Sequence, residues 1–161
     1  MTIADLDHLT LVQKKSLLQK CCGSSAWVSN MLEIFPVNDL IDLLEYADDT
    51  WQKCDEKDWL EAIVGDPITD DTELLSERYA SGEHSGVNIV SQQVQQSLVQ
   101  SGKLYSEKFG FPFIAFASQK SEGEMLSAIL ERLNNSKDEE IKVAAAEQLQ
   151  IIKMRLRKLF A

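Results

Sequence analysis

The densest apolar run in the sequence is Phe109-Gly110-Phe111-Pro112-Phe113-Ile114-Ala115-Phe116-Ala117. Burying one large apolar side chain stabilises a fold by ~1.5–3 kcal/mol, so this run belongs in a core. Gly110 and Pro112 disfavour a helix through its start, because glycine is entropically costly and proline lacks an N–H. The run therefore predicts a short extended crossing at residues 109–117. The N–H groups of such buried backbone need partners, which helices or a bound ligand can supply.

Helical periodicity dominates on both sides of this crossing. A stripe of residues spaced three and four apart predicts one long helix before it, and Ser121 is expected to begin a helix after it. That stripe is Val87, Val90, Val94, Leu98, Gly102, Tyr105 and Phe109. The apolar residues expected to face inward after Ser121 are Met125, Leu126, Ile129, Leu130 and Leu133. The last helix is expected to run to about Leu159, with acidic residues in its first turn and basic residues in its last, as the helix dipole favours.

The first half of the chain predicts four more helices. The first covers about residues 9–21, with Val12 among its apolar positions, and the second covers about residues 25–34, with Ser24 as its N-cap. Asn38 is expected to cap a third helix that buries Ile41 and its apolar neighbours as far as residue 51. Asp55 opens a fourth, with Asp58 at capping-box spacing, and residues 73–79 are also helical in pattern. The sequence thus predicts an all-α fold, a single-domain helical bundle of about seven to nine helices over residues 1–161.

Composition excludes several classes of function. The net charge of −10 argues against nucleic acid and anionic membranes as partners. No apolar run approaches the ~20 residues that a membrane span needs, and the N-terminus lacks a secretory signal pattern. The three cysteines, with Cys21 and Cys22 adjacent, form neither a disulfide framework nor a zinc spacing. Buried thiols in a reducing compartment are the simplest interpretation, and the protein is expected to be cytoplasmic.

Two loops and one helical residue are the remaining candidates for a functional site. Gly65-Asp66-Pro67 either ends a helix, with Asp66 accepting a hydrogen bond from a backbone N–H, or forms part of a functional site. Glu83 and His84 lie between two glycines and read either as a solvated loop or as a carboxylate–imidazole pair. Arg155 lies at the edge of a buried stripe and is either a surface residue that complements the helix dipole or a ligand anchor. No P-loop, dinucleotide fingerprint or metal-ligand helix pair is present in the sequence.

A set of short motifs in fixed order resembles one family across nearly the whole chain. These motifs are Cys21-Cys22-Gly23-Ser24-Ser25-Ala26-Trp27, Asp58-Trp59-Leu60-Glu61-Ala62, Lys108-Phe109-Gly110-Phe111, Glu124-Met125-Leu126, Glu131-Arg132-Leu133, Ala145-Ala146-Glu147-Gln148 and Arg155-Leu156. They resemble the 2-oxo-4-hydroxy-4-carboxy-5-ureidoimidazoline (OHCU) decarboxylases of uric acid breakdown. The resemblance implies an all-α homodimer that decarboxylates this ureidoimidazoline substrate to (S)-allantoin without a cofactor or a metal.

The resemblance also implies roles for particular residues. Arg155 matches the family's substrate-anchoring arginine, and Glu83 matches its active-site glutamate. Pro67 matches the proline of a His-Pro dipeptide. The family's backbone N–H donors near the end of the crossing match the segment that contains Ile114, Ala115 and Ala117.

Several departures from the family pattern fall on the site itself, among them Ile68-Thr69-Asp70 in place of an Arg-Ile-Gly segment. The family's catalytic histidine reads Asp66 here, the glutamine that follows the glutamate reads His84, and a serine reads Ala80. An aspartate can still act as a base, and an imidazole at His84 suits proton transfer near neutral pH. The leading hypothesis is therefore an OHCU decarboxylase in which Asp66, Glu83 and His84 handle protons. It requires that Arg155 lie near Glu83.

Two alternatives stay open. A catalytically degenerate homologue would bind a ureide or a protein partner, which would account for the missing histidine, serine and glutamine. A related decarboxylase with a different substrate cannot be separated from the first two readings by sequence.

Overall fold

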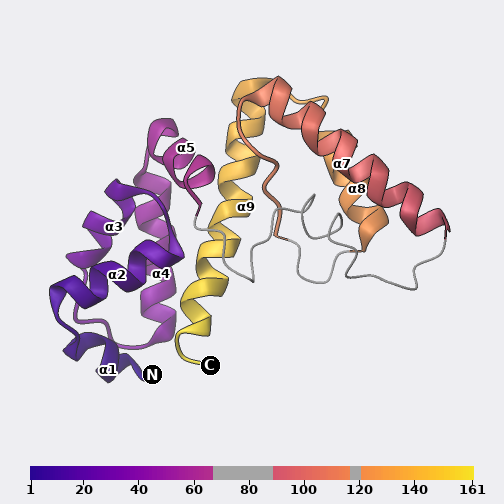
Figure 1. The fold of residues 1–161 in the computed structure, drawn as a ribbon. Helices are drawn as coiled ribbons and strands as arrows, with labels where there is room; N and C mark the ends of the chain where they lie inside the picture. The colour runs from indigo at the N-terminus through magenta and orange to yellow at the C-terminus, as the bar shows by residue number, and fades with distance from the viewer. Residues whose placement is uncertain (67–88, 117–120) are drawn as a thin grey trace. The chain divides into compact units, whose positions relative to one another are not determined.

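The computed structural model describes residues 1–66, 89–116 and 121–161, with the side chains of residues 89–91 not described (Figure 1). These ranges contain eight helices, which are α1 (Ile3–His8), α2 (Leu11–Cys21), α3 (Ser25–Leu32), α4 (Leu40–Lys53), α5 (Glu56–Val64), α7 (Ile89–Phe109), α8 (Glu122–Arg132) and α9 (Lys137–Lys158). The all-α prediction is confirmed. None of the helices within those ranges combines the length and apolar character that crossing a membrane requires.

The chain divides into two compact units. One comprises Met1–Pro67 with Gln148–Ala161, and the other comprises Ile68–Glu147. Helix α9 contributes its first half to the second unit and its second half to the first unit. The single-domain organisation over residues 1–161 stays a prediction.

The core of the first unit is built around α3, which contacts α2, α4 and α5 (Figure 1). Trp27 on α3 is fully buried, and its indole Nε1 donates to the Ala47 carbonyl of α4 at 3.1 Å. Trp51 on α4 is also buried, and α9 adds Ile152 and Leu156, both with no exposed surface. A buried indole that finds a hydrogen-bond partner keeps its full apolar contribution to stability.

Side chains cap most of the helices where the sequence places a capping residue. Ser24 accepts from the N–H of Trp27 at the start of α3, and Ser121 accepts from the N–H of Glu124 at the start of α8. Asp55 opens α5 with the predicted capping box. Each cap satisfies N–H groups that have no partner within the helix, so the helix starts are fixed locally.

Two helix starts differ from the prediction. Asp39, not Asn38, caps α4, because its Oδ1 accepts from the N–H of Asp42 at 2.8 Å. Asn38 instead donates its backbone N–H to Asp42 Oδ2 at 3.0 Å. Helix α1 was not predicted. Its signal is a short capping box in which Thr2 and Asp5 exchange hydrogen bonds.

Three apolar residues of the predicted helical patterns face outward. Val12 is 78% exposed, Ile41 is 68% exposed and Leu130 is 50% exposed. Their neighbours Leu43 and Ile129 are buried on the same helices. The buried stripe of each helix is narrower than its apolar stretch, and single apolar residues are common on protein surfaces.

The second unit packs α7 beside α8 (Figure 1), and aromatic rings of α7 and of the crossing pack on one another. The Tyr105 ring centroid lies 4.7 Å from that of Phe109 and 5.1 Å from that of Phe113. Helix α7 ends at Phe109, and Gly110 follows with φ of +80° while its N–H donates to the Ser106 carbonyl at 2.9 Å. Glycine adopts this left-handed conformation without a steric penalty, so the chain leaves the helix there. Residues 111–116 are non-helical, as predicted for the crossing.

Candidate functional site

Arg155 is a buried residue of α9, with 6% of its surface exposed. The interpretation of a surface arginine is therefore wrong. Its Nη1 donates to Asp66 Oδ1 at 2.7 Å and its Nη2 donates to Asp66 Oδ2 at 2.9 Å. Nη1 also donates to the Cys21 carbonyl at 3.1 Å. This bidentate geometry is the arrangement in which a guanidinium binds a carboxylate most strongly.

Asp66 is positioned by the end of α5. Gly65 terminates that helix, and its N–H donates to the Glu61 carbonyl at 3.0 Å. A Cβ placed on Gly23 would lie 3.0 Å from the Gly65 carbonyl oxygen, so the α2–α3 turn lies directly against this point. The Asp66 carboxylate, 11% exposed, also accepts from Gln148 Nε2 at 3.2 Å. Asp66 thus serves as the counter-ion of Arg155 inside the first unit.

Two buried polar atoms of this cluster have no hydrogen-bond partner in the described part of the chain. They are Gln148 Oε1, an acceptor, and Arg155 Nε, a donor. Buried polar atoms in folded proteins nearly always bond to protein, water or ligand. The cluster of Asp66, Gln148 and Arg155 therefore still offers one donor and one acceptor.

The cysteines beside this cluster are free and buried. Burial raises the pKa of the Cys21 thiol to about 11, although the nearby Arg155 opposes the shift. Burial likewise raises the pKa of Cys54 to about 11. Since the thiolate is the reactive form, neither side chain is a nucleophile at neutral pH.

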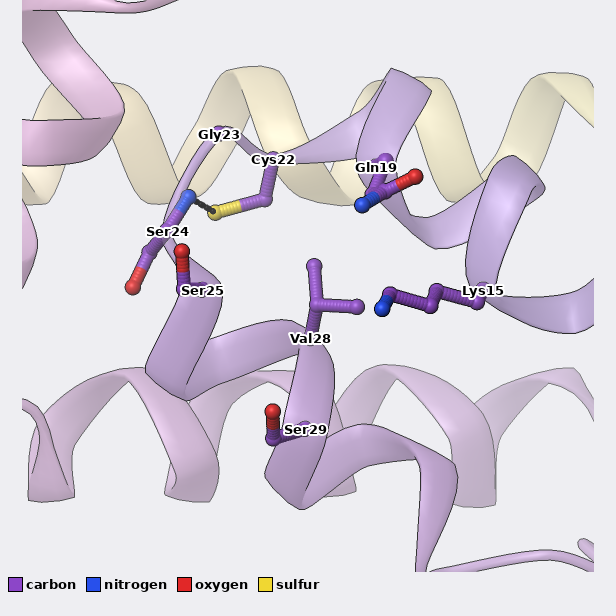
Figure 2. Close-up of a pocket in the computed structure, with 8 residues that line it drawn as sticks. All are labelled: Lys15, Gln19, Cys22, Gly23, Ser24, Ser25, Val28 and Ser29. Atoms are coloured by element: carbon purple, nitrogen blue, oxygen red, sulfur yellow. Dashed lines mark hydrogen bonds between the residues drawn. The ribbon is translucent and has the colours of Figure 1, made fainter. Parts of the chain in front are cut away.

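A pocket of about 320 Å³ opens between α2 and α3 in the first unit (Figure 2). It is lined by Lys15, Gln19, residues 22–25, Val28 and Ser29. The Ser24 N–H donates to Cys22 Sγ at 3.5 Å across its rim. Among the described residues, the lining holds no carboxylate or imidazole and includes neither Asp66 nor Arg155. The pocket offers polar contacts, and its ionisable lining groups are Lys15 and the Cys22 thiol.

The crossing in the second unit is fixed by a buried charged network. Arg132 on α8 donates from Nε to Glu140 Oε1 at 2.7 Å and from Nη1 to the Ile114 carbonyl at 2.8 Å. The Tyr105 hydroxyl donates to the same Glu140 carboxylate. The Arg132 guanidinium also lies 4.3 Å from the centroid of the Phe113 ring. A buried carboxylate with this many donors is fully compensated, so the network holds the crossing in one conformation.

The end of the crossing is held by α9. The Phe116 N–H donates to Glu147 Oε2 at 3.1 Å. Ile114 is buried, whereas Ala115 is half-buried. Within residues 1–66, 89–116 and 121–161, no group of three or more His, Cys, Asp or Glu side chains is arranged to hold a metal ion.

The predicted site residues are thus placed in part. The structure brings Asp66 and Arg155 together in the first unit and places Ile114 and Ala115 in the second. Pro67, Glu83, His84 and Ala117 lie outside the described residues, so the predicted approach of Arg155 to Glu83 stays a prediction.

The sequence prediction missed two polar residues that the structure places in these clusters. Gln148 lies seven residues before Arg155, which is two helical turns, so the two share a face of α9. Arg132 belongs to one of the motifs that carry the resemblance. A polar side chain in an otherwise buried helical stripe was the signal in both cases.

The sequence is similar to those of known proteins. The family model for OHCU decarboxylase matches residues 8–157. The chain is 33% identical over 147 residues to the uric acid degradation bifunctional protein TTL of Arabidopsis thaliana, covering 88% of this chain and 45% of that protein. It is 23% identical to the OHCU decarboxylase of Halalkalicoccus jeotgali, covering 99% of this chain and 92% of that one.

A solved structure agrees with these relatives. It is the crystal structure of an OHCU decarboxylase in the presence of (S)-allantoin, with 32% identity and a TM-score of 0.70. The similarity covers 88% of this chain and 95% of that one. The chain therefore spans less than half of the Arabidopsis protein but nearly all of the solved one. Because the family model covers most of the sequence and the fold agrees, the chain belongs to the OHCU decarboxylase family.

Proposed function

We propose that the protein decarboxylates 2-oxo-4-hydroxy-4-carboxy-5-ureidoimidazoline to (S)-allantoin without a cofactor, in uric acid degradation. The observation that carries this proposal is the Asp66–Arg155 pair, in which a buried guanidinium already holds a carboxylate through two hydrogen bonds of 2.7 and 2.9 Å. The Asp66 carboxylate stands in for the carboxylate of a substrate. Substrate binding then requires Asp66 to leave Arg155.

Loss of carbon dioxide leaves negative charge that the substrate ring delocalises. Arg155 orients the departing carboxylate, and the N–H groups of Ile114, Ala115 and Ala117 stabilise the charge that develops on the ring. We also assign Pro67 to substrate binding.

Proton transfer to one face of the ring gives a single enantiomer of the product. We assign this transfer to Glu83 with His84 or with the Asp66 carboxylate once Arg155 has released it. The proposal also includes a homodimer in the cytoplasm.

Freshly prepared OHCU added to the full chain tests the proposal. The circular dichroism of optically active allantoin should rise faster than the spontaneous reaction allows. Arg155→Gln should lower kcat/KM by about 100-fold, because one bidentate charged contact is worth roughly 3 kcal/mol. A wild-type rate equal to the spontaneous rate rejects the enzyme.

A second candidate is a catalytically degenerate homologue that binds a neutral ureide. The same ion pair favours it, because Asp66 neutralises the cation that an anionic substrate would need. The double variant Asp66→His with His84→Gln separates the candidates. Activity gained from an inactive wild type supports degeneration, whereas loss of an existing activity supports catalysis through the present residues.

A further inference from the structure

Two side chains fix the peptide groups on either side of Ala115. Arg132 Nη1 donates to the Ile114 carbonyl at 2.8 Å, and this arginine is held by its 2.6 Å ion pair with Glu140. On the other side, the Phe116 N–H donates to Glu147 Oε2 at 3.1 Å. All six residues belong to the second unit.

Because the peptide groups are planar, these two contacts fix the directions of the Ala115 N–H and carbonyl. In a planar trans peptide the C=O and the following N–H point in opposite directions. With the Ile114 carbonyl directed at Arg132, the Ala115 N–H is directed away from Arg132. With the Phe116 N–H directed at Glu147, the Ala115 carbonyl is directed away from Glu147.

Ala115 is therefore left with an oriented donor and an oriented acceptor. Neither its N–H nor its carbonyl forms a hydrogen bond in the part of the chain that the structure describes. The residue is half-buried and its side chain is a single methyl group, so a small ligand can approach the backbone. One donor beside one acceptor matches the cis-amide of a cyclic ureide, in which N–H and C=O lie side by side.

We propose that Arg132 and Glu147 are positioning residues that orient the Ala115 peptide groups to bind a cyclic ureide. This inference deepens the proposed function and rests on it only for the choice of ureide. Neither side chain touches the ligand. Each acts through the backbone, and Arg132 is itself held in place by Glu140 and by the face of Phe113.

Nuclear magnetic resonance of the full chain labelled with ¹⁵N-alanine tests the proposal, with hydantoin as the probe. The Ala115 amide signal, assigned by its loss in Ala115→Gly, should shift saturably as hydantoin is added. Glu147→Ala should weaken this binding about tenfold, the effect of roughly 1.4 kcal/mol. Glu147→Gln should retain it, because the amide oxygen can still accept from the Phe116 N–H.

Arg132→Lys adds a second measurement on the other peptide group. Lysine keeps the charge beside Glu140 but cannot bond to Glu140 and the Ile114 carbonyl in the same fork, so hydantoin binding should again weaken. Because Glu147 lies outside the buried Arg132–Glu140 pair, its variants keep the test decisive even if Arg132→Lys does not fold.

Several outcomes overturn the proposal. The first is an Ala115 signal that does not move when hydantoin is added. The second is equal affinity for hydantoin in Glu147→Ala and the wild type. The third is a loss of affinity in Glu147→Gln as large as that in Glu147→Ala. Failure of the proposed function is distinguishable. An Ala115 signal that shifts in a chain with no decarboxylase activity leaves the positioning role standing, whereas decarboxylation with an unmoved Ala115 removes it.

Discussion

The Asp66–Arg155 pair joins residues that lie 89 positions apart in the sequence and closes α9 against the end of α5. Both side chains are largely removed from water. The net contribution of such a pair to stability is small, because desolvation offsets the attraction between the charges. Removing one partner is costly, because the other charge remains buried and uncompensated.

Asp66→Asn should therefore lower the free energy of unfolding by about 3 kcal/mol. The matched control is Asp48→Asn, which removes the carboxylate from the more exposed Asp48–Lys153 pair. Pairs of that kind contribute roughly 0.2–1 kcal/mol. Urea unfolding of both variants measures the difference.

Sodium acetate provides the second arm of this experiment. Acetate should restore part of the stability of Asp66→Ala, because this truncation empties the place beside Arg155 and a free carboxylate can fill it. Equal concentrations of sodium chloride should not. An Asp66→Asn variant as stable as Asp48→Asn, or an Asp66→Ala variant that is indifferent to acetate, would contradict the account of the pair.

Tyr105→Phe should cost about 1–2 kcal/mol of stability, because Glu140 loses a buried hydrogen-bond donor while the ring packing is kept. Tyr46, 40% exposed, offers a control. Tyr46→Phe should change stability by less than about 0.5 kcal/mol. Equal effects in thermal or urea unfolding would show that the Tyr105 hydroxyl contributes nothing to the network.

At the scale of elements, the starts of α3, α5 and α8 were predictable, whereas α1 was missed and the cap of α4 was placed one residue early. Ser24, Asp55 and Ser121 cap helices because a short polar side chain before an apolar stripe satisfies free N–H groups, which is a local effect. The breaks at Gly65 and Gly110 were local as well. Which face of a helix is buried depends on the elements that pack against it, so periodicity alone gave the wrong direction for Ile41 and Leu130.

Gly23→Ala should destabilise the first unit by about 1–3 kcal/mol. The new Cβ would lie 3.0 Å from the Gly65 carbonyl oxygen, which is backbone and must shift. The shift moves the end of α5, so the contribution of the Asp66–Arg155 pair to stability should also fall. Adding Asp66→Asn should then lower the free energy of unfolding less in Gly23→Ala than in the wild type.

Gly123→Ala is the matched control on α8, where an added Cβ meets nothing within 4 Å. Alanine is favoured over glycine in a helix by up to about 1 kcal/mol, so this variant should be neutral or more stable. Destabilisation of the two variants by the same amount would contradict the steric argument.

At the scale of the whole molecule, the fold class followed from the sequence because apolar stripes of helical period run through most of it. The site followed less completely. Arg155 was identified, but its burial and its pairing with Asp66 depend on a contact between segments far apart in the chain. The roles of Gln148 and Arg132 were missed for the same reason, since each acts through a partner on another element.

Alkaline pH should destabilise the protein through several buried groups at once. Burial raises the pKa of Cys21 from 9.0 to about 11, and the same cause raises that of Cys54 to about 11. Burial and then the hydrogen bond to Glu140 raise the pKa of Tyr105 further still. These groups favour the folded state below their unfolded pKa values, and that stability is lost as pH rises towards the folded values.

The free energy of unfolding should therefore fall between pH 9 and pH 11. Urea titrations across this range measure it, and Cys21→Ala should show a shallower decline, because one of the groups that ionise on unfolding is gone. A flat profile, or an unchanged slope in Cys21→Ala, would show that the thiols do not ionise differently in the two states.

The position of Asp66 gives the protein a competitor for Arg155 that never diffuses away. A tethered carboxylate acts at a high effective concentration, so any incoming carboxylate meets an arginine that is free in only a fraction of molecules. Its apparent dissociation constant is the intrinsic value divided by that fraction. A ligand that binds through its carboxylate alone would therefore be held weakly, and one that makes further contacts would be favoured over it.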